Sequence, residues 1–349
     1  MTMTDMKLFI SKVASGKILD EVEAEQAFNI IMSGDATPSQ IGGFLMALRV
    51  RGEAVSEITG AARALRAKAL KIEAPEEAMD VVGTGGDGTG TYNISTGAAI
   101  VLAGCGVPVA KHGNRALSSK SGSADVLTSL GLNNEAPFEL IKRSIWEVGL
   151  GFLMAPRHHS ATRHVAGTRI ELATRTIFNL LGPISNPCNV KKQLTGVYSR
   201  DWVEPIAHTL ANLGCERAWV VHGSDGSDEL TTTGISYVAS LDQGNVEVFE
   251  VSPSDAGIEF AKPEQLKGGD SVFNAAAITD MLNGSLGPYR DIVIFNAAAA
   301  LIVGGKATSL SQGTKIAAEA IDSGQAKSVL EKMLKITSLT EQEKKGNDV

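Results

Sequence analysis

Residues 78–96 read AMDVVGTGGDGTGTYNIST, and the rest of the predicted fold is arranged around this segment. Its apolar residues up to Val82 are typical of a short buried strand. Five glycines follow within eight residues, from Gly83 to Gly90. Glycine is costly inside a helix or strand, but it lets backbone N–H groups approach an anion closely. Polar residues then precede an apolar helix that Thr96 is placed to cap. A strand, a glycine loop and a helix N-terminus in this order predict a phosphate site.

The glycine loop has two other interpretations. Gly83, Gly85 and Gly88 satisfy G-x-G-x-x-G, the pattern of dinucleotide-binding folds. That pattern expects an acidic residue about 20 residues further on. Here the next strand-like run ends in the basic pair Lys111-His112, which argues against a dinucleotide. The second alternative is a glycine-rich turn without a ligand, although a turn does not need so many polar side chains.

Composition narrows the class of protein. The chain has 349 residues, of which 43% are hydrophobic and 20% charged, as in ordinary globular proteins of one or two domains. The net charge of −7 argues against a general nucleic-acid binder. Three widely spaced cysteines without C-x-x-C indicate reduced thiols and a cytoplasmic protein. No apolar run approaches the ~20 residues that cross a bilayer, so no membrane association is expected.

The N-terminal quarter of the sequence is predicted to be helical. One amphipathic helix ends near Gly34. A second begins at Thr37-Pro38, where a capping hydroxyl precedes proline, and stops at Gly52. A third begins near Ser56. Such short helices must pack on other elements to bury their apolar faces.

After Pro75, apolar strands alternate with helices. The predicted strands are Met79–Val82, Val107–Ala110, Gly151–Ala155, Leu194–Tyr198, Ala218–Val221 and Ile292–Phe295. The predicted helices between them are Gly97–Cys105, Ala124–Leu130, Phe138–Val148 and Val203–Leu213. Residues 234–251 predict a hairpin at the edge of the sheet. The alternation predicts an α/β fold with a central, mostly parallel sheet flanked by helices.

The segment 159–187 is long for a connection between strands and is itself helix-like. We expect it to return to the N-terminal helices. The predicted division is therefore a small helical domain, residues 1–75 plus roughly 165–190, hinged to a large α/β domain, residues 76–164 and 191–349.

A second polar loop follows the second predicted strand. Residues 111–127 read KHGNRALSSKSGSADVL and supply three cations and several hydroxyls, with Ser123 at a predicted helix N-cap. Carboxyl ends of neighbouring parallel strands meet at one edge of a sheet, so this loop should lie beside the glycine loop. Two such loops suit a ligand with more than one phosphate. The alternative is a polar surface loop.

Two further clusters supply charge. Asp228-Glu229 follows another predicted strand, and with Ser95 it offers the oxygen ligands that Mg²⁺ prefers; Asp225 is a weaker candidate. Several arginines and histidines lie in 157–175, and an arginine there suits the carboxylate of an acidic co-substrate. No Ser or Cys has the sequence context of an activated nucleophile, and no acid or base is assigned. Together these features predict a magnesium-dependent enzyme acting on a polyphosphorylated small molecule.

Three motifs give the chain a family resemblance. GTGGDGTGTYNIST at 83–96, KHGNRALSSKSGSADVL at 111–127 and RTIFNLLGPISNP at 175–187 together resemble the anthranilate phosphoribosyltransferase family. The resemblance extends over essentially the whole chain. It implies transfer of the 5-phosphoribosyl group of phosphoribosyl pyrophosphate to the amine of anthranilate, with release of pyrophosphate, in tryptophan biosynthesis. It also implies a homodimer joined through helical domains.

The resemblance also implies residue roles. Those expected to bind phosphoribosyl pyrophosphate are Gly83, Gly86, Asp87, Thr91, Asn93, Ser95, Thr96, Lys111, His112, Gly113, Asn114, Arg115, Ala116, Leu117, Ser118, Ser119 and Ser123. Those expected to contact anthranilate or line its path are Gly83, Asn114, Arg169, His112 and His159. Ser95, Asp228 and Glu229 are expected to hold Mg²⁺.

Two rivals share the expected architecture. A pyrimidine nucleoside phosphorylase would use a nucleobase and phosphate, but the HGN sequence after Lys111 and the pair Asp228-Glu229 favour the transferase. A non-enzymatic relative that binds nucleic acid should be basic and lack the acidic pair, whereas this chain is acidic and has both carboxylates.

Overall fold

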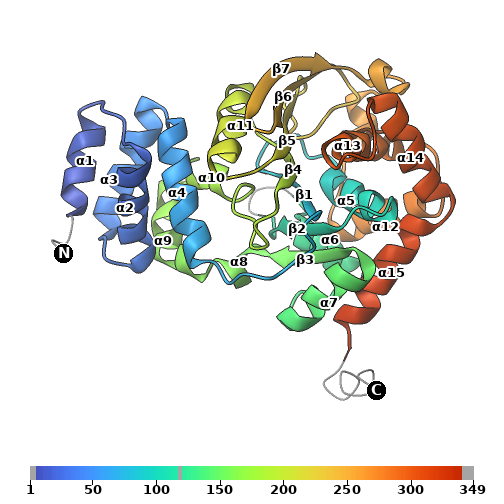
Figure 1. The fold of residues 1–349 in the computed structure, drawn as a ribbon, viewed down its shortest axis with the longest axis horizontal. Coiled ribbons are helices and arrows are strands. Elements are labelled where there is room, and N and C mark those ends of the chain that lie inside the picture. The colour runs from blue at the N-terminus through green and yellow to red at the C-terminus, as the bar shows by residue number, and fades with distance from the viewer. Residues whose placement is uncertain (1–4, 117–119, 340–349) are drawn as a thin grey trace.

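The computed structural model describes residues 5–116 and 120–339. Four N-terminal helices lie together at one end of the molecule (Figure 1): α1 (Met6–Ala14), α2 (Glu21–Ser33), α3 (Pro38–Arg51) and α4 (Val55–Lys68). Helix α3 begins as predicted, because the Thr37 hydroxyl accepts a hydrogen bond from the N–H of Gln40 and Pro38 takes the first helical position. Helix α2 ends at Gly34, whose φ of 83° suits glycine. Helix α1 was not predicted as a separate element.

A seven-stranded sheet forms the centre of the larger part, with strand order β3-β2-β1-β4-β5-β6-β7. The pairs from β3 to β5 are parallel, and β5, β6 and β7 pair antiparallel. The predicted mostly parallel sheet is confirmed, and so is the edge hairpin, which turns through left-handed Gln243 and Gly244. The strands are β1 (Met79–Gly83), β2 (Val109–Gly113), β3 (Leu150–Met154), β4 (Lys192–Gly196), β5 (Arg217–Gly223), β6 (Ser236–Asp242) and β7 (Asn245–Val251).

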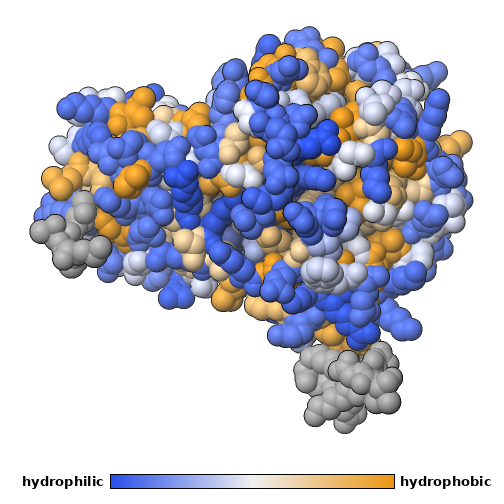
Figure 2. All heavy atoms as spheres, viewed as in Figure 1, coloured by the Kyte–Doolittle hydropathy of each residue, from blue (hydrophilic) through white to orange (hydrophobic). Residues whose placement is uncertain are grey.

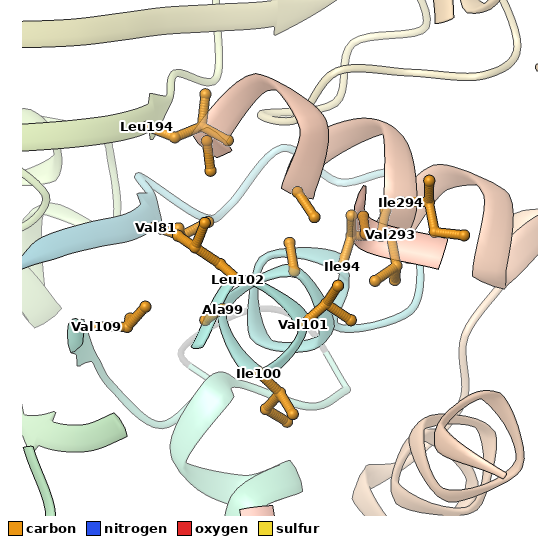
Figure 3. Packing of buried hydrophobic residues seen from close by; sticks show 14 of the residues in the cluster. Val81, Ile94, Ala99, Ile100, Val101, Leu102, Val109, Leu194, Val293 and Ile294 are labelled. Carbon is orange, nitrogen blue, oxygen red and sulfur yellow. The ribbon is translucent and has the colours of Figure 1, made fainter. Parts of the chain in front are cut away.

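Helices cover both faces of this sheet (Figure 1). On one face, Val81 of β1 and Val109 of β2 pack with α5 and α13 in the main apolar core (Figure 3). On the other face, Ala110 packs with α7 and Ala218 with α11. These helices and their neighbours are α5 (Ile94–Gly104), α6 (Ser123–Ser129), α7 (Phe138–Val148), α11 (Val203–Asn212), α12 (Ser271–Leu282), α13 (Pro288–Val303), α14 (Leu310–Asp322) and α15 (Gln325–Thr337).

One predicted strand is wrong. Residues Ile292–Phe295 lie inside α13, a helix of 16 residues that is buried on almost every side. A β-branched apolar run has no periodicity that separates a buried strand from a helix enclosed by other elements. The helical prediction for the chain after Phe295 is correct, but the helix begins earlier, at Pro288.

The connection between β3 and β4 passes along the helical end of the molecule. It contains α8 (Ala155–His158), α9 (Arg163–Leu172) and α10 (Phe178–Leu181). Helix α9 contacts α2 and α3, and α10 contacts α4. The motif at 175–187 is thereby held between the N-terminal helices and the sheet.

The face of the molecule seen in Figure 1 is mostly polar, with separate apolar patches (Figure 2). Exposed apolar side chains of the N-terminal helices include Leu8, Val22 and Val50. Within residues 5–116 and 120–339, no helix combines the length and the apolar character needed to cross a membrane.

Candidate active site

A cleft of about 370 Å³ lies beyond the carboxyl ends of β1 and β2 and also reaches α4, α9 and α10. Every described residue to which the family resemblance assigns a role lines this cleft. They are Gly83, Gly86, Asp87, Thr91, Asn93, Ser95, Thr96, Lys111, His112, Gly113, Asn114, Arg115, Ala116, Ser123, His159, Arg169, Asp228 and Glu229. Leu117, Ser118 and Ser119 lie outside the described residues. Residues far apart in the chain therefore meet at one edge of the sheet, as open α/β folds arrange them.

The first wall of the cleft is the glycine loop between β1 and α5. Gly85, Gly86, Gly88 and Gly90 have φ between 65° and 78°, a left-handed backbone that side chains with a Cβ rarely adopt. The Asp87 carboxylate accepts hydrogen bonds from the N–H and hydroxyl of Thr89 and so stays within the loop. The glycines are therefore required by the path of the backbone.

The predicted helix cap at this loop is wrong in detail. Asn93, not Thr96, precedes α5 as its N-cap residue, and Thr96 lies buried inside the helix. Helix α5 begins at Ile94, three residues before the predicted start at Gly97. The apolar pattern misses this first turn because its polar residues face the cleft. Ser95 and Thr96 reach the cleft from that turn.

Asp228 and Glu229 line the cleft beside the glycine loop and the first turn of α5. The Asp228 Oδ2 accepts a 2.6 Å hydrogen bond from the N–H of Gly85, and the Glu229 Oε1 accepts one of 3.3 Å from the N–H of Ser95. Burial raises the pKa of Asp228 to about 6, with repulsion from Asp87 as a second cause. Burial and the neighbouring Asp228 raise the pKa of Glu229 well above its usual value. The fold thus brings two buried carboxylates together, and their negative charges destabilise the folded protein unless a cation binds to them.

The weaker acidic candidate has a different role. Asp225 accepts hydrogen bonds from Ser227, Thr231 and Thr233, and these bonds lower its pKa against the opposing effect of burial. It is not among the cleft residues. Its carboxylate shapes the loop that carries Asp228.

Lys111 is a buried cation beneath the cleft. It belongs to β2, and so do His112 and Gly113, which corrects the prediction that a loop begins at Lys111. Its Nζ donates to the carbonyl of Val81 at 2.6 Å and lies 3.4 Å from the Ser95 hydroxyl. Burial lowers its pKa, and the nearby carboxylates of Asp80, Glu229 and Asp228 oppose that effect. The ammonium is therefore close enough to the acidic pair to interact with it electrostatically.

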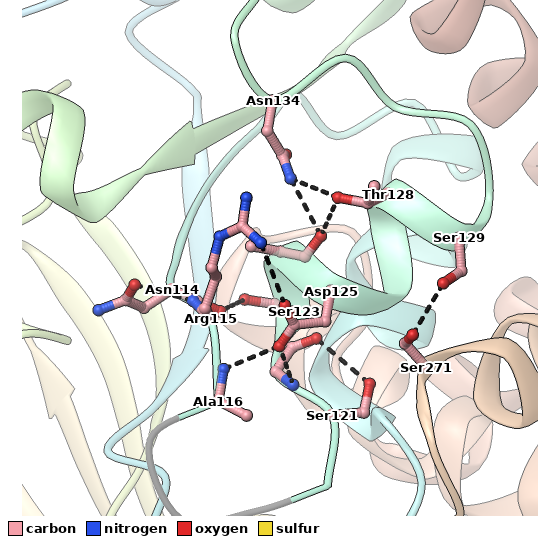
Figure 4. Close-up of polar contacts among 12 residues, drawn as sticks. Asn114, Arg115, Ala116, Ser121, Ser123, Asp125, Thr128, Ser129, Asn134 and Ser271 are labelled. Carbon is pink, nitrogen blue, oxygen red and sulfur yellow. Dashed lines mark hydrogen bonds and ion pairs between the residues drawn. The ribbon is translucent and has the colours of Figure 1, made fainter.

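The second loop turns around one carboxylate (Figure 4). The Asp125 Oδ2 accepts hydrogen bonds from the N–H groups of Ala116 and Gly122, at 2.8 and 3.0 Å. Gly122 is the N-cap of α6, whereas Ser123 is its first residue and donates to the carbonyl of Asn114. The prediction that Ser123 caps this helix is therefore wrong, although Ser123 faces the cleft.

Another part of the cleft wall carries Arg169 and two histidines whose rings are in contact. The Arg169 guanidinium lies 5.5 Å from the centre of the Phe178 ring, and burial lowers its pKa. Among described residues, no carboxylate lies within 4 Å of this guanidinium. The rings of His112 and His159 meet edge to face at 5.1 Å, and Nδ1 of His112 is 3.1 Å from the carbonyl of Gly182. A partly buried cation without an acidic partner suits an anionic group of a ligand.

Sequence reasoning missed several residues of the cleft wall. Phe178, Leu181 and Pro183 lie in the motif at 175–187, whose largely apolar sequence indicates no role for its single residues. Arg175 of the same motif donates to the carbonyl of Gly86 and stacks 4.2 Å from the centre of the Tyr198 ring. Gly269 lies about 180 residues from the glycine loop, and no local pattern marks it.

The buried histidines make stability depend on pH. Burial and the neighbouring His158 lower the pKa of His159 to about 4. Between that value and the usual 6.5, the unfolded chain binds a proton that the folded chain does not, so acid destabilises the fold. Lowering the pH from 7.5 to 5.5 should therefore cost roughly 1.3 kcal/mol through His159 alone. Urea unfolding at both pH values should show this loss reduced in His159→Gln but unchanged in His208→Gln, whose side chain is exposed. Equal losses in all three proteins would contradict the buried neutral state of His159.

Comparison with known proteins places the chain in a family. Residues 75–327 match the glycosyl transferase family, a/b domain, and residues 7–69 match the glycosyl transferase family, helical bundle domain. The chain is 61% identical to anthranilate phosphoribosyltransferase of Azospirillum brasilense over 96% of its own length and 94% of the relative's. It is 60% identical to that of Paramagnetospirillum magneticum, over 97% and 98% of the two lengths.

Solved structures agree with the sequence comparison. Anthranilate phosphoribosyltransferase of Thermus thermophilus superposes with a TM-score of 0.90 at 42% identity, covering 95% of this chain and 99% of that one. The Saccharomyces cerevisiae enzyme in complex with PRPP (phosphoribosyl pyrophosphate) and Mg gives 0.88 at 28% identity, covering 97% and 99%. The same yeast enzyme in complex with 4-fluoroanthranilate gives 0.86 at 27% identity, covering 95% and 97%. The resemblance inferred from the three motifs is thus confirmed, and the chain belongs to the anthranilate phosphoribosyltransferase family of glycosyl transferases.

Proposed function

We propose that the protein transfers the 5-phosphoribosyl group of phosphoribosyl pyrophosphate to the amine of anthranilate, releasing pyrophosphate, as a step of tryptophan biosynthesis. One observation carries the proposal. A glycine loop, a buried lysine with an acidic pair, and an arginine without an acidic partner among the described residues line a single cleft. These three parts match a polyphosphate, a divalent cation and a carboxylate, the charged groups that this reaction brings together.

The phosphoribosyl pyrophosphate site comprises the two loops and the first turn of α5. In this proposal Gly83, Gly86 and Asp87 surround the pyrophosphate, and Thr91, Asn93, Ser95 and Thr96 complete the site. Lys111 to Ala116 and Ser123 approach from β2 and the second loop, while the expected contacts of Leu117, Ser118 and Ser119 fall outside the described residues. Left-handed glycines support this assignment, because a loop backbone without side chains lets an anion approach its N–H groups closely.

Magnesium fits the donor set of the acidic pair. Ser95, Asp228 and Glu229 offer oxygen atoms only, which hard cations prefer, and both carboxylates have raised pKa values that a cation would reverse. Among the described residues, no three His, Cys, Asp or Glu side chains form a metal site. The remaining ligands would thus come from substrate phosphate and water. Bound Mg²⁺ would supply electrostatic stabilisation of the departing pyrophosphate.

Lys111 and Arg169 have complementary tasks in this scheme. Negative charge grows on pyrophosphate as its bond to the ribose breaks, and the Lys111 ammonium and the loop N–H groups are fixed in advance to stabilise it. Arg169 holds the anthranilate carboxylate and thereby aims the amine at C1′ of the ribose. Gly83 and Asn114 contact the acceptor, and His112 and His159 line its path.

Replacing Arg169 with alanine should mainly weaken acceptor binding. Losing one charge-assisted hydrogen bond of ~1.5–3 kcal/mol predicts a KM for anthranilate that rises roughly 10–100-fold. The KM for phosphoribosyl pyrophosphate should change less than about two-fold. Steady-state kinetics with each substrate varied in turn measures both, with Arg163→Ala in the same helix as control. An unchanged KM for anthranilate would place the carboxylate contact elsewhere.

Product analysis separates the proposal from its rivals. Mass spectrometry after incubation with anthranilate, phosphoribosyl pyrophosphate and Mg²⁺ should show N-(5-phosphoribosyl)anthranilate. Phosphorolysis of thymidine or uridine without that product would instead indicate a nucleoside phosphorylase. Tight binding of single-stranded DNA at physiological salt, again without product, would indicate a non-enzymatic protein that binds nucleic acid. Binding of NAD or NADP would favour the dinucleotide interpretation.

The proposal includes the organisation of the protein. We propose a helical domain of residues 1–75 and roughly 165–190, hinged to an α/β domain of residues 76–164 and 191–349. The contacts of α9 with α2 and α3, and of α10 with α4, support this division. We also propose a cytoplasmic homodimer joined through the helical domains, where Leu8, Val22 and Val50 are exposed. Light scattering of the purified protein tests the dimer.

A further inference from the structure

Asn274 lies buried behind the phosphoribosyl pyrophosphate site, in the first turn of α12. Its Nδ2 donates to Oδ1 of Asn93 at 2.9 Å, and its Oδ1 accepts from the N–H of Gly269 at 2.8 Å. A backbone N–H can only donate, so Gly269 fixes which end of the Asn274 amide faces Asn93. Asn274 does not line the cleft, but both of its partners do.

Asn93 is a junction between the two loops of the site. Its Nδ2 donates to the carbonyl of Ser121, and its Oδ1 accepts from the Ser121 hydroxyl, both at 3.1 Å. Because a carbonyl only accepts, Ser121 fixes the orientation of the Asn93 amide, which leaves Oδ1 facing Asn274. Three hydrogen bonds inside the protein therefore determine where the Asn93 side chain lies. The two bonds to Ser121 join the end of the glycine loop to the second loop.

The backbone before α12 packs on the same stretch of the glycine loop. Thr91 forms an isolated antiparallel bridge with Lys267, and the N–H of Gly268 donates to the carbonyl of Gly90 at 3.0 Å. A Cβ on Gly268 would lie 2.5 Å from the carbonyl oxygen of Thr91, so a side chain does not fit between the two segments. Gly269 follows at once, and Asn274 holds its N–H. The buried amide of Asn274 therefore connects the backbone before α12 to Asn93.

We propose that Asn274 is a positioning residue for phosphoribosyl pyrophosphate, which holds Asn93 so that both loops keep the geometry that binds the substrate. The inference rests on the proposed function, because it concerns the same site. Asn274 touches no substrate in this scheme and acts through Asn93 and Gly269. A buried polar group that loses its partner costs more than the bond alone, so the effect of losing the amide donor should be large.

Asn274→Asp tests this role with a change of one group. The aspartate keeps an acceptor for the N–H of Gly269, but it places an oxygen against Oδ1 of Asn93. Calorimetric titration with phosphoribosyl pyrophosphate and Mg²⁺ should show a Kd raised roughly 10–100-fold, and the KM for that substrate should rise alike. The KM for anthranilate should stay within about two-fold. Asn283→Asp makes the same chemical change at the exposed far end of α12 and should leave all three constants unchanged.

A second variant and the thermal midpoint separate positioning from stability. Asn274→Ala introduces no charge and should raise the same Kd, even if the aspartate variant folds poorly. A lower unfolding midpoint with an unchanged Kd in folded variants would overturn the inference, because a merely structural asparagine predicts that result. If the unchanged protein bound no phosphoribosyl pyrophosphate, the proposed function would fail and this inference with it. Binding by the unchanged protein and equally by both variants would overturn the inference alone.

Discussion

Turnover should fall about 10³-fold or more when Asp228 is replaced by asparagine and Glu229 by glutamine. Each replacement keeps the shape of the side chain but removes the charge that holds a cation, and loss of metal assistance is worth several kcal/mol of transition-state stabilisation. The wild-type rate should rise with added Mg²⁺, whereas the double variant should respond little. Initial rates over a magnesium series measure this directly.

The acidic-pair variant should remain folded. Burial raises the pKa values of both carboxyls in the folded chain, so their ionisation opposes folding when no cation is bound. That cost appears above the unfolded pKa of about 4, grows until the pH reaches the folded values and is constant above them. At pH 7.5 without divalent cations, the amides should therefore leave the unfolding midpoint unchanged or higher. Glu76→Gln with Glu77→Gln, two exposed carboxylates, is the matched control for turnover. Near-normal turnover of the Asp228/Glu229 variant at low magnesium would refute the metal role.

Gly196→Ala should lower the activity because the added methyl group displaces the backbone at Asp228. Gly196 ends β4, and a Cβ there would lie 1.5 Å from the carbonyl oxygen of Asp228. No rotamer relieves a clash with backbone, so the segment carrying the acidic pair has to move or the strand end has to distort. We expect kcat/KM to fall at least about 100-fold, since misplacing reactive groups by about 1 Å costs that much. We also expect a lower unfolding midpoint.

Gly43→Ala provides the contrast. Gly43 lies in α3, and a Cβ added there would meet nothing within 4 Å. Alanine in a helix interior should stabilise the protein by roughly 0.5–1 kcal/mol and leave turnover unchanged. Thermal unfolding and kinetics on both variants make the comparison. If Gly196→Ala kept wild-type turnover, the contact between β4 and Asp228 would not be needed to hold the acidic pair.

Local patterns were sufficient to predict much of this molecule. The five glycines after Val82 predicted the loop, and Thr37-Pro38 predicted the start of α3, because backbone conformation there depends on nearby residues. The alternation of apolar runs predicted the parallel sheet. Ile292–Phe295 was assigned wrongly because its burial within a helix depends on distant elements that enclose α13.

Some residues of the cleft can be predicted from local sequence and others cannot. The charged and hydroxyl-bearing residues that lie in glycine-containing motifs were predicted. No local pattern marks Asn274 and Gly269, because Asn274 gains its importance from a hydrogen bond to Asn93, 181 residues earlier, and Gly269 acts through Asn274. Lys111 was identified, but its burial in β2 beneath Ser95 became evident only when β1, β2 and the acidic pair were placed together.

Anthranilate is fluorescent, so its consumption by the protein can be followed as the reaction proceeds. Purified protein mixed with anthranilate, phosphoribosyl pyrophosphate and Mg²⁺ should consume the fluorescent amine. The decay should require all three components and should be lost in the Asp228/Glu229 variant. A folded protein that binds phosphoribosyl pyrophosphate yet leaves anthranilate fluorescence unchanged would contradict the proposed acceptor, and the site would then belong to a transferase for another amine or nucleobase.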